Sequence, residues 1–189
     1  NGSDYDLALV RYNSDGSLDT TFSGDGKLTT AIGASHDQAE SMIQQADGKL
    51  VTAGTSYNGS NYDFALVRYN TDGTLDTTFN GNGKLTTAIG SLNDVAASII
   101  QQADGKLVVA GYRNNGSNDD FALVRYNSDG SLDTTFNVTG KLTTAIGASH
   151  DQVYSVIQQA DGKLVAAGSS SNGSDYDLAL VRYNSDGSL

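Results

Sequence analysis

A 57-residue repeat constrains this chain more than any other feature of its sequence. The string DLALVRYN at 6–13 returns as DFALVRYN at 63–70 and 120–127, and again as DLALVRYN at 177–184, with no insertion or gap between copies. Residues 1–18 and 172–189 are identical, so the chain equals three periods plus 18 residues. Repeats of this kind bury their apolar surface against neighbouring copies. We therefore expect residues 1–189 to form a single repeat array, with units 6–62, 63–119 and 120–176 and a partial unit 177–189.

Each repeat contains four candidate β-strands. Around the second repeat these strands are residues 39–46, 49–56, 63–70 and 84–89. Asp47 and Gly48 separate the first two, and an Asp-Gly pair between β-type runs predicts a hairpin whose two turn residues both have positive φ. The loop 57–61 and the longer connection 71–83 join the others. Because every link is short or moderate, an antiparallel meander is the simplest topology.

The apolar pattern of the inner strands indicates which β fold the repeats form. A sheet with one wet face alternates apolar and polar residues, but LVVA at 107–110 and FALV at 121–124 are apolar on both faces. The last strand, 84–89, is more polar. Sheets covered on both faces, with a wetter outer strand, are typical of β-propeller blades. We expect an all-β fold of tandem four-stranded antiparallel meander blades. The blade-like units are 36–90 and 93–147, with split blades at both ends.

The link between the third and fourth strands also repeats, as LDTTF at 18–22, 75–79 and 132–136. We expect Leu75 and Phe79 to hold this link against the blade, and Asp76 to bond the local backbone. An arginine stands between valine and tyrosine on every third strand. It could recognise a carboxylate ligand, but a structural ion pair with a residue of the Asp76 or Asp104 type is the commoner arrangement. These arginines are Arg11, Arg68, Arg125 and Arg182.

Several motifs match one known family in order. The string DFALVRYN-x-DG-x-LD-x-x-F, followed by GK and by Q-x-DGKLV-x-AG, resembles the delta-60 repeat family over essentially the whole chain. The resemblance implies β-propeller repeats of long, secreted or cell-surface bacterial proteins, mostly without an assigned function. The family pattern often has proline before Asp-Gly, whereas this chain has Ala46, Ala103 and Ala160.

Three repeats are too few for a closed ring, since propellers usually have about four to eight blades. Three alternatives remain open. The chain is a segment of a longer repeat protein, or its copies associate head to tail into a ring or filament, or its units stack as an open rod. Each makes the expected partners copies of this chain or further repeats of the same protein.

Composition excludes several partners. The 22 Asp and Glu residues against 11 Lys and Arg give a formal net charge of −11, which argues against binding to nucleic acid or to an anionic membrane surface. The chain has no cysteine, so neither disulfides nor thiolate metal sites are expected. No apolar run approaches the ~18 residues of a transmembrane helix.

An oxygen-rich motif around a glycine allows two interpretations. One is an Asx-type turn whose carboxylates bond their own backbone. The other is a calcium site resembling part of an EF-hand loop, although the bidentate Glu of that loop is missing. We expect the turn and no cofactor. The candidate calcium ligands are Asn70, Asp72, Asp76, Asn127, Asp129 and Asp133.

Asn58, Asn115 and Asn137 fit the N-x-Ser/Thr glycan acceptor pattern. Because Asn-Gly is also a common turn pair, we expect the first two to serve as turn residues. His36 and His150 occupy equivalent positions, with Asn93 between them in the repeat, and we expect solvated loop residues there.

No Ser-His-Asp set or paired catalytic carboxylates stand out, and near-identical repeats supply the same groups everywhere, whereas catalysis needs unlike groups at one place. We therefore expect no enzyme. The leading hypothesis is an extracellular, non-catalytic structural or adhesive repeat module, either a segment of a longer repeat protein or a fibre-forming assembly. The alternative is a propeller that binds a glycan or a peptide.

Overall fold

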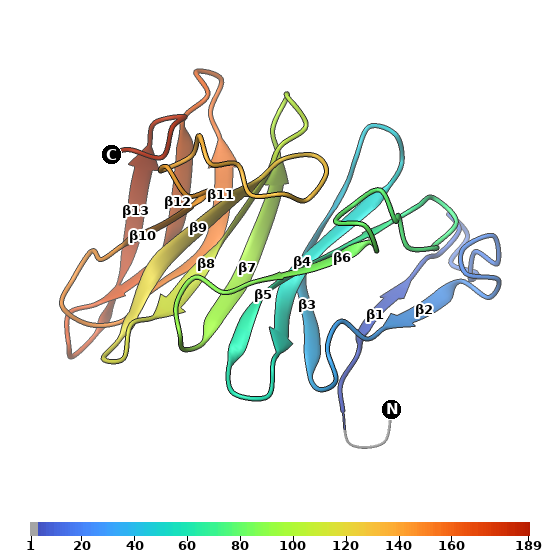
Figure 1. The fold of residues 1–189 in the computed structure, drawn as a ribbon, viewed down its shortest axis with the longest axis horizontal. Coiled ribbons are helices and arrows are strands. Elements are labelled where there is room, and N and C mark those ends of the chain that lie inside the picture. Colours follow the sequence, from blue (N-terminus) through green and yellow to red (C-terminus); the bar gives the residue numbers. More distant parts are fainter. Residues whose placement is uncertain (1–3) are drawn as a thin grey trace.

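The computed structural model of the protein describes residues 4–189, and its regular secondary structure is β-strand throughout (Figure 1). Within these residues there is no helix of the length and apolar character needed to cross a membrane. In chain order the strands are β1 (Leu7–Val10), β2 (Lys27–Thr30), β3 (Asp37–Gln44), β4 (Leu50–Tyr57), β5 (Tyr62–Tyr69), β6 (Lys84–Thr87), β7 (Asp94–Gln101), β8 (Leu107–Asn114), β9 (Asp119–Tyr126), β10 (Lys141–Thr144), β11 (Asp151–Gln158), β12 (Leu164–Ser171) and β13 (Tyr176–Tyr183).

These strands form four antiparallel sheets in sequence order. The sheet β3-β4-β5-β6 is called the first blade, β7-β8-β9-β10 the second blade and β11-β12-β13 the third blade. The pair β1-β2 is called the N-terminal sheet. Figure 1 shows the sheets following one another from the N-terminal side to the C-terminal side without closing into a ring. The predicted all-β fold of tandem antiparallel blades is thereby confirmed.

The core lies between the blades. Leu107 and Val109 of β8 belong to the apolar cluster shared with the first blade, whereas Val108 and Ala110 belong to the cluster shared with the third blade. All four side chains are fully buried. A strand whose alternate residues enter two different cores must be apolar at every position, and this explains the pattern that predicted the fold.

The hairpin between the first two strands of each blade lies where it is predicted, but its turn type differs. Gly48 has a φ of 84°, while Asp47 does not have positive φ. Gly48 N–H donates to the carbonyl of Gln45 at 2.9 Å, and Gln45 N–H donates to the carbonyl of Lys49 at 2.8 Å. The loop is therefore a three-residue turn ending in one left-handed glycine. The prediction that both turn residues have positive φ is wrong.

A glycine in the second strand of each blade lets the first strand come close. A Cβ added to Gly54 would lie 1.9 Å from the carbonyl oxygen of Gln38. The strand register shifts at the same place, between Ala39 and Ser41. Such a bulge bends the first strand, and it recurs opposite Gly111 and Gly168.

Candidate functional site

A network centred on arginine joins each blade to the next. Arg68 Nε lies 2.8 Å from Asp76 Oδ2, and its Nη1 donates to the carbonyl oxygen of Ser128, in the following blade, at 2.6 Å. The guanidinium also lies over the ring of Phe79, 4.7 Å from the centroid, which adds a cation–π attraction. Phe79 itself is fully buried. The predicted role of phenylalanine in holding the long link is confirmed.

The same contacts recur 57 residues before and after. Arg11 pairs with Asp19 at 2.8 Å and Arg125 pairs with Asp133 at 2.7 Å. The predicted structural ion pair with the Asp76-type residue is therefore confirmed. Asp104, the other suggested partner, pairs instead with Lys106 at 3.5 Å.

The buried carboxylates of this network are held in the charged form. Burial raises the pKa of Asp76, but hydrogen bonds from Thr78 and Lys49 and the charge of Arg68 outweigh it, and the pKa lies well below its usual value. Lys49 Nζ lies 2.9 Å from Asp76 Oδ2. Asp133 is held in the same way by Thr135, Lys106 and Arg125. Because these carboxylates bind arginine and lysine, Asp76 or Asp133 could transfer a proton only if those contacts were broken.

A second set of contacts reaches back to the preceding sheet. Tyr69 donates its hydroxyl hydrogen to Thr30 Oγ1 of the N-terminal sheet at 2.8 Å, and burial raises the pKa of Tyr69 to about 12. Tyr126 reaches back to Thr87 at 2.9 Å in the same manner. Each inner blade is thus linked forward by arginine and backward by tyrosine.

The predicted solvated histidines also belong to the links between sheets. His36 Nδ1 accepts a hydrogen bond from the backbone N–H of Tyr5 at 3.2 Å. At the next interface Asn93 Oδ1 accepts from Tyr62 N–H at 3.0 Å. Both histidines lie in loops as predicted, and the His150 side chain is 42% exposed, but His150 also repeats the contact by accepting from Asp119 N–H at 3.2 Å. The 57-residue spacing of these three acceptors is the signal that could have revealed their role.

The candidate calcium ligands are bonded to their own turns. Asp72 Oδ1 accepts from Thr74 N at 2.9 Å and from Thr74 Oγ1 at 2.7 Å, and Asn70 Nδ2 donates to Thr74 Oγ1 at 3.0 Å. Asp76 faces Arg68 instead. Between residues 4 and 189 no group of three or more Asp, Glu, His or Cys side chains is placed to hold a metal ion. The second set, Asn127, Asp129 and Asp133, repeats these contacts.

The candidate glycan acceptors use their amide nitrogens in hydrogen bonds. Asn58 Nδ2 donates to Asp63 Oδ2 at 2.8 Å and also to Asn61 Oδ1. Asn115 Nδ2 donates to Asp120 Oδ2 at 2.9 Å, and Asn137 Nδ2 donates to the carbonyl of Lys141 at 2.7 Å. Attachment of a sugar removes one amide hydrogen, so at Asn58 and Asn115 it would cost a contact. Modification at these positions stays a prediction.

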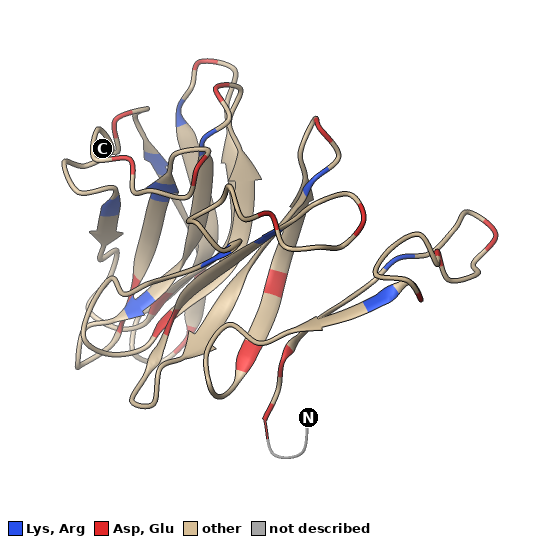
Figure 2. Ribbon diagram, turned by 45° about the vertical axis from the view of Figure 1, so that its right-hand side comes forward, with Lys and Arg blue, Asp and Glu red and all other residues tan. Residues whose placement is uncertain are grey.

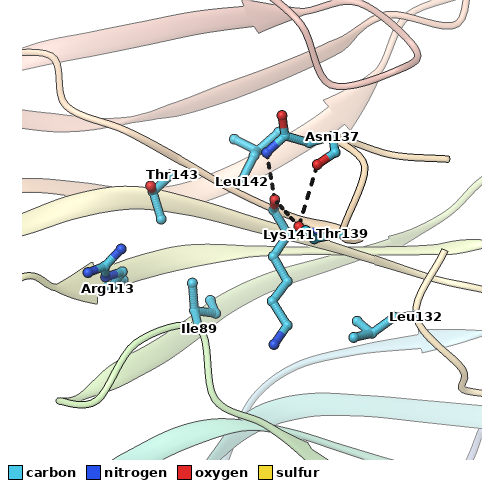
Figure 3. Close-up of a pocket in the computed structure, with 8 residues that line it drawn as sticks. All are labelled: Ile89, Arg113, Leu132, Asn137, Thr139, Lys141, Leu142 and Thr143. Atoms are coloured by element: carbon cyan, nitrogen blue, oxygen red, sulfur yellow. Dashed lines mark hydrogen bonds between the residues drawn. The ribbon is translucent and has the colours of Figure 1, made fainter. Parts of the chain in front are cut away.

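One groove differs from the repeated interfaces. It has a volume of about 440 Å³, and Arg113 and Lys141 bring two cations to it (Figure 3). Acidic residues are spread over loops and strands elsewhere (Figure 2), whereas none lines this groove. Arg113 stands where the other blades have Ser56 and Ser170. Sequence reasoning missed it, because a residue present in one repeat gives no periodic signal. The remaining lining residues are Ile89, Leu132, Asn137, Thr139, Leu142 and Thr143.

Comparison with known families adds one match. The family described as "Domain of unknown function (DUF5122) beta-propeller" matches residues 1–22, 45–79, 102–136 and 159–189, which together exceed half of the chain. The matched segments contain the hairpin turns, the second and third strands and the LDTTF link. No curated protein matched the chain.

Proposed function

We propose a function from the premise that the chain belongs to the DUF5122 β-propeller family. The protein acts as a non-catalytic structural module, either as part of a longer repeat protein or as the unit of a fibre-forming assembly. One observation carries this proposal. The Arg–Asp–Phe network has the same partners at each of three successive interfaces, centred on Arg11, Arg68 and Arg125. Repeats with identical interfaces can be added one after another, and this gives an array rather than a single specialised site.

The polar chemistry of the interfaces supports a role without catalysis. The most strongly shifted carboxylates, Asp76 and Asp133, each contact an arginine and a lysine. A catalytic acid or base needs a pKa close to the working pH and access to a substrate, and these buried, permanently charged groups have neither.

An extracellular location and an adhesive role complete the proposal. They are supported by the resemblance to delta-60 repeats, which are typical of secreted and cell-surface bacterial proteins. The finer assignment to the delta-60 family belongs to the same proposal. The partners are copies of the chain or further repeats, and neither nucleic acid nor membrane lipid is among them.

Negative-stain electron microscopy of the purified chain tests the structural role. We expect rods, filaments or multi-copy particles that disappear when an open apolar face is charged, as in Ile157→Asp. Val138→Asp is the matched control, since Val138 is exposed on a loop. A chain that stays single at every concentration would contradict the assembly role.

The alternative, a ligand-binding propeller, is favoured by the groove with Arg113 and Lys141. Its cations and its apolar wall suit an acidic glycan or an acidic peptide. Retention on an array of such ligands, lost in Arg113→Ser, would support this function. The serine variant is well matched, because serine occupies the equivalent position in both other blades.

A further inference from the structure

One arginine interrupts the repeat inside the array. Arg113 stands near the end of β8, where the first and third blades have Ser56 and Ser170. Its side chain lies at the interface between the first and second blades, the two sheets that have all four strands, and a Cβ added to Gly90 would be 2.9 Å from its Nε. That Nε is buried and has no hydrogen-bond partner among residues 4–189. Because an unpaired buried N–H destabilises the folded state, the stability of the blade does not explain this arginine.

The carboxylate opposite Arg113 does not require it either. Asp94 is opposite Arg113 in the register of β7 with β8, but its Oδ2 accepts from the backbone N–H of Ile89 at 2.7 Å. Asp37 and Asp151 hold their own loops by the same contact, and serine stands opposite each of them. Burial raises the pKa of Asp94, and the charge of Arg113 opposes this only in part. The loop therefore folds without an arginine, and the guanidinium remains able to bind a ligand.

Lys141 supplies the second positive charge of the groove (Figure 3). Its Nζ donates to the carbonyl of Ala88 at 2.7 Å, which uses one of the three hydrogens of an ammonium group. Lys84 makes the same contact with Ala31 at the preceding interface, but serine takes the place of Arg113 there. Among residues 4–189, the two cations are therefore combined only between the first and second blades.

The rest of the lining suits a peptide better than a sugar. Ile89 and Leu132 provide apolar surface, and the volume of about 440 Å³ is within the range of ordinary ligand pockets. None of the described residues that line the groove has an aromatic ring. Asn137 Nδ2 and Thr139 Oγ1 already donate to the carbonyl of Lys141. A sugar has hydroxyl groups around its ring that each need a partner when they lose water, and this lining offers few.

We propose that this groove binds an acidic peptide segment, with Arg113 and Lys141 holding one aspartate or glutamate carboxylate. Ile89 and Leu132 contact an apolar side chain next to it. The terminal nitrogens of an arginine present paired donors that match the two oxygens of a carboxylate. The inference rests on the ligand-binding alternative and names its ligand. Because the groove lies between two blades of one chain, it does not depend on assembly.

The net charge of −11 does not prevent this binding. At physiological ionic strength, exposed charges separated by more than about 8 Å are largely screened from each other, and no acidic residue lines the groove. An acidic peptide is therefore attracted at short range by Arg113 and Lys141, and its affinity should fall as salt is added.

An array of short acetylated peptides tests the inference. Each peptide carries one Glu or Asp beside leucine, valine or isoleucine, and a matched peptide carries Gln or Asn instead. We expect the wild-type chain to be retained on acidic peptides and not on their amide counterparts. For the best peptide, fluorescence polarisation should show that Arg113→Ser raises Kd about tenfold or more, as expected for a lost hydrogen bond between charged groups.

The repeat provides matched controls. Lys84→Gln is the control for Lys141→Gln, because Lys84 makes the same contact at an interface without the arginine. We expect Lys141→Gln to raise Kd several-fold and Lys84→Gln to leave it unchanged. Circular dichroism and urea unfolding verify that each variant folds, and Arg113→Ser restores the residue of both other blades.

The possible contrary results lead to different conclusions. Peptide binding that is unchanged in Arg113→Ser, or weakened equally by Lys84→Gln and Lys141→Gln, would overturn the site. Retention on oligomers of glucuronic acid but not on acidic peptides would overturn the peptide assignment and leave a ligand-binding groove. No retention on either would overturn the inference together with the ligand-binding alternative, whereas rods or filaments in electron microscopy would still support the structural role.

Discussion

One position of the repeat offers a direct measurement of what a neighbouring blade contributes. Leu66, Leu123 and Leu180 are equivalent leucines on the third strands of the three blades. Leu66 and Leu123 are 0% exposed, whereas Leu180 is 62% exposed, since residues 4–189 contain no blade that follows the third one. The perturbation is the same substitution, leucine to alanine, at each position.

The expected losses differ several-fold. Substituting a fully buried leucine by alanine costs about 3–5 kcal/mol, because transfer free energy is lost and a cavity remains. Full burial of a leucine side chain contributes about 1.5–3 kcal/mol. Leu180 has less than half of its surface covered and leaves no enclosed cavity, so its substitution should cost about 1 kcal/mol or less.

Urea unfolding followed by circular dichroism measures these losses, at protein concentrations where the wild type is a single chain. The slope of the free energy against urea must stay constant across the variants for the midpoints to be compared. Equal losses for Leu123→Ala and Leu180→Ala would refute the reasoning, since burial by the next blade would then not determine the cost. Small losses at all three positions would refute it as well.

Three further predictions concern the polar contacts between blades and within the turn 70–76. The depressed pKa of Asp76 and Asp133 means that their contribution to folding is present above about pH 4 and is lost as the pH falls further. Measuring the free energy of unfolding as a function of pH should show this loss of stability in acid. Asp76→Asn should cost about 3 kcal/mol at pH 7 and should make the loss of stability in acid smaller. The raised pKa of Tyr69 means that its contribution to the free energy of unfolding is complete below about pH 10 and is lost as the pH rises towards 12. Tyr69→Phe should cost about 1 kcal/mol at pH 7 and should make the loss of stability at alkaline pH smaller. An unchanged dependence of stability on alkaline pH would contradict this role of Tyr69. A calcium chelator should leave the melting temperature unchanged, and a fall of several degrees would instead show that the turn 70–76 holds an ion.

The sequence predicts the blades well, because both causes of the fold are visible in it. The period identifies equivalent residues, and unbroken apolar runs such as 107–110 reveal strands covered on two sides. The end of the fourth strand is harder to predict from the sequence. The prediction is 84–89, but β6 ends at Thr87, since the backbone N–H of Ile89 turns away to donate to Asp94 Oδ2 at 2.7 Å. That carboxylate lies on the next blade, and only the folded arrangement brings it to the loop.

The polar contacts between blades were predicted only where both partners lie close in the sequence. Arg68 and Asp76 are eight residues apart, and their pairing follows from the repeated motif. His36 and Tyr5 are 31 residues apart, and their contact depends on how one sheet lies against the next. Periodicity shows that such residues are equivalent, but it does not show which loop meets which strand. The turn at Asp47 was misassigned for a different reason, since one dipeptide occurs in more than one turn type.

Under the proposed structural role, repetition makes the addition of further copies favourable. Leu66 and Leu123 lose all exposure in the inner blades, while Leu178 at the end of the array remains 80% exposed. An open array has two such ends whatever its length, so every added copy raises the number of buried interfaces without raising the number of open faces. The share of blades that are covered on both sides therefore increases with each copy, and a closed ring leaves no open face. In the proposed array, each added copy therefore gains stability through the same contacts that fold one blade against the next.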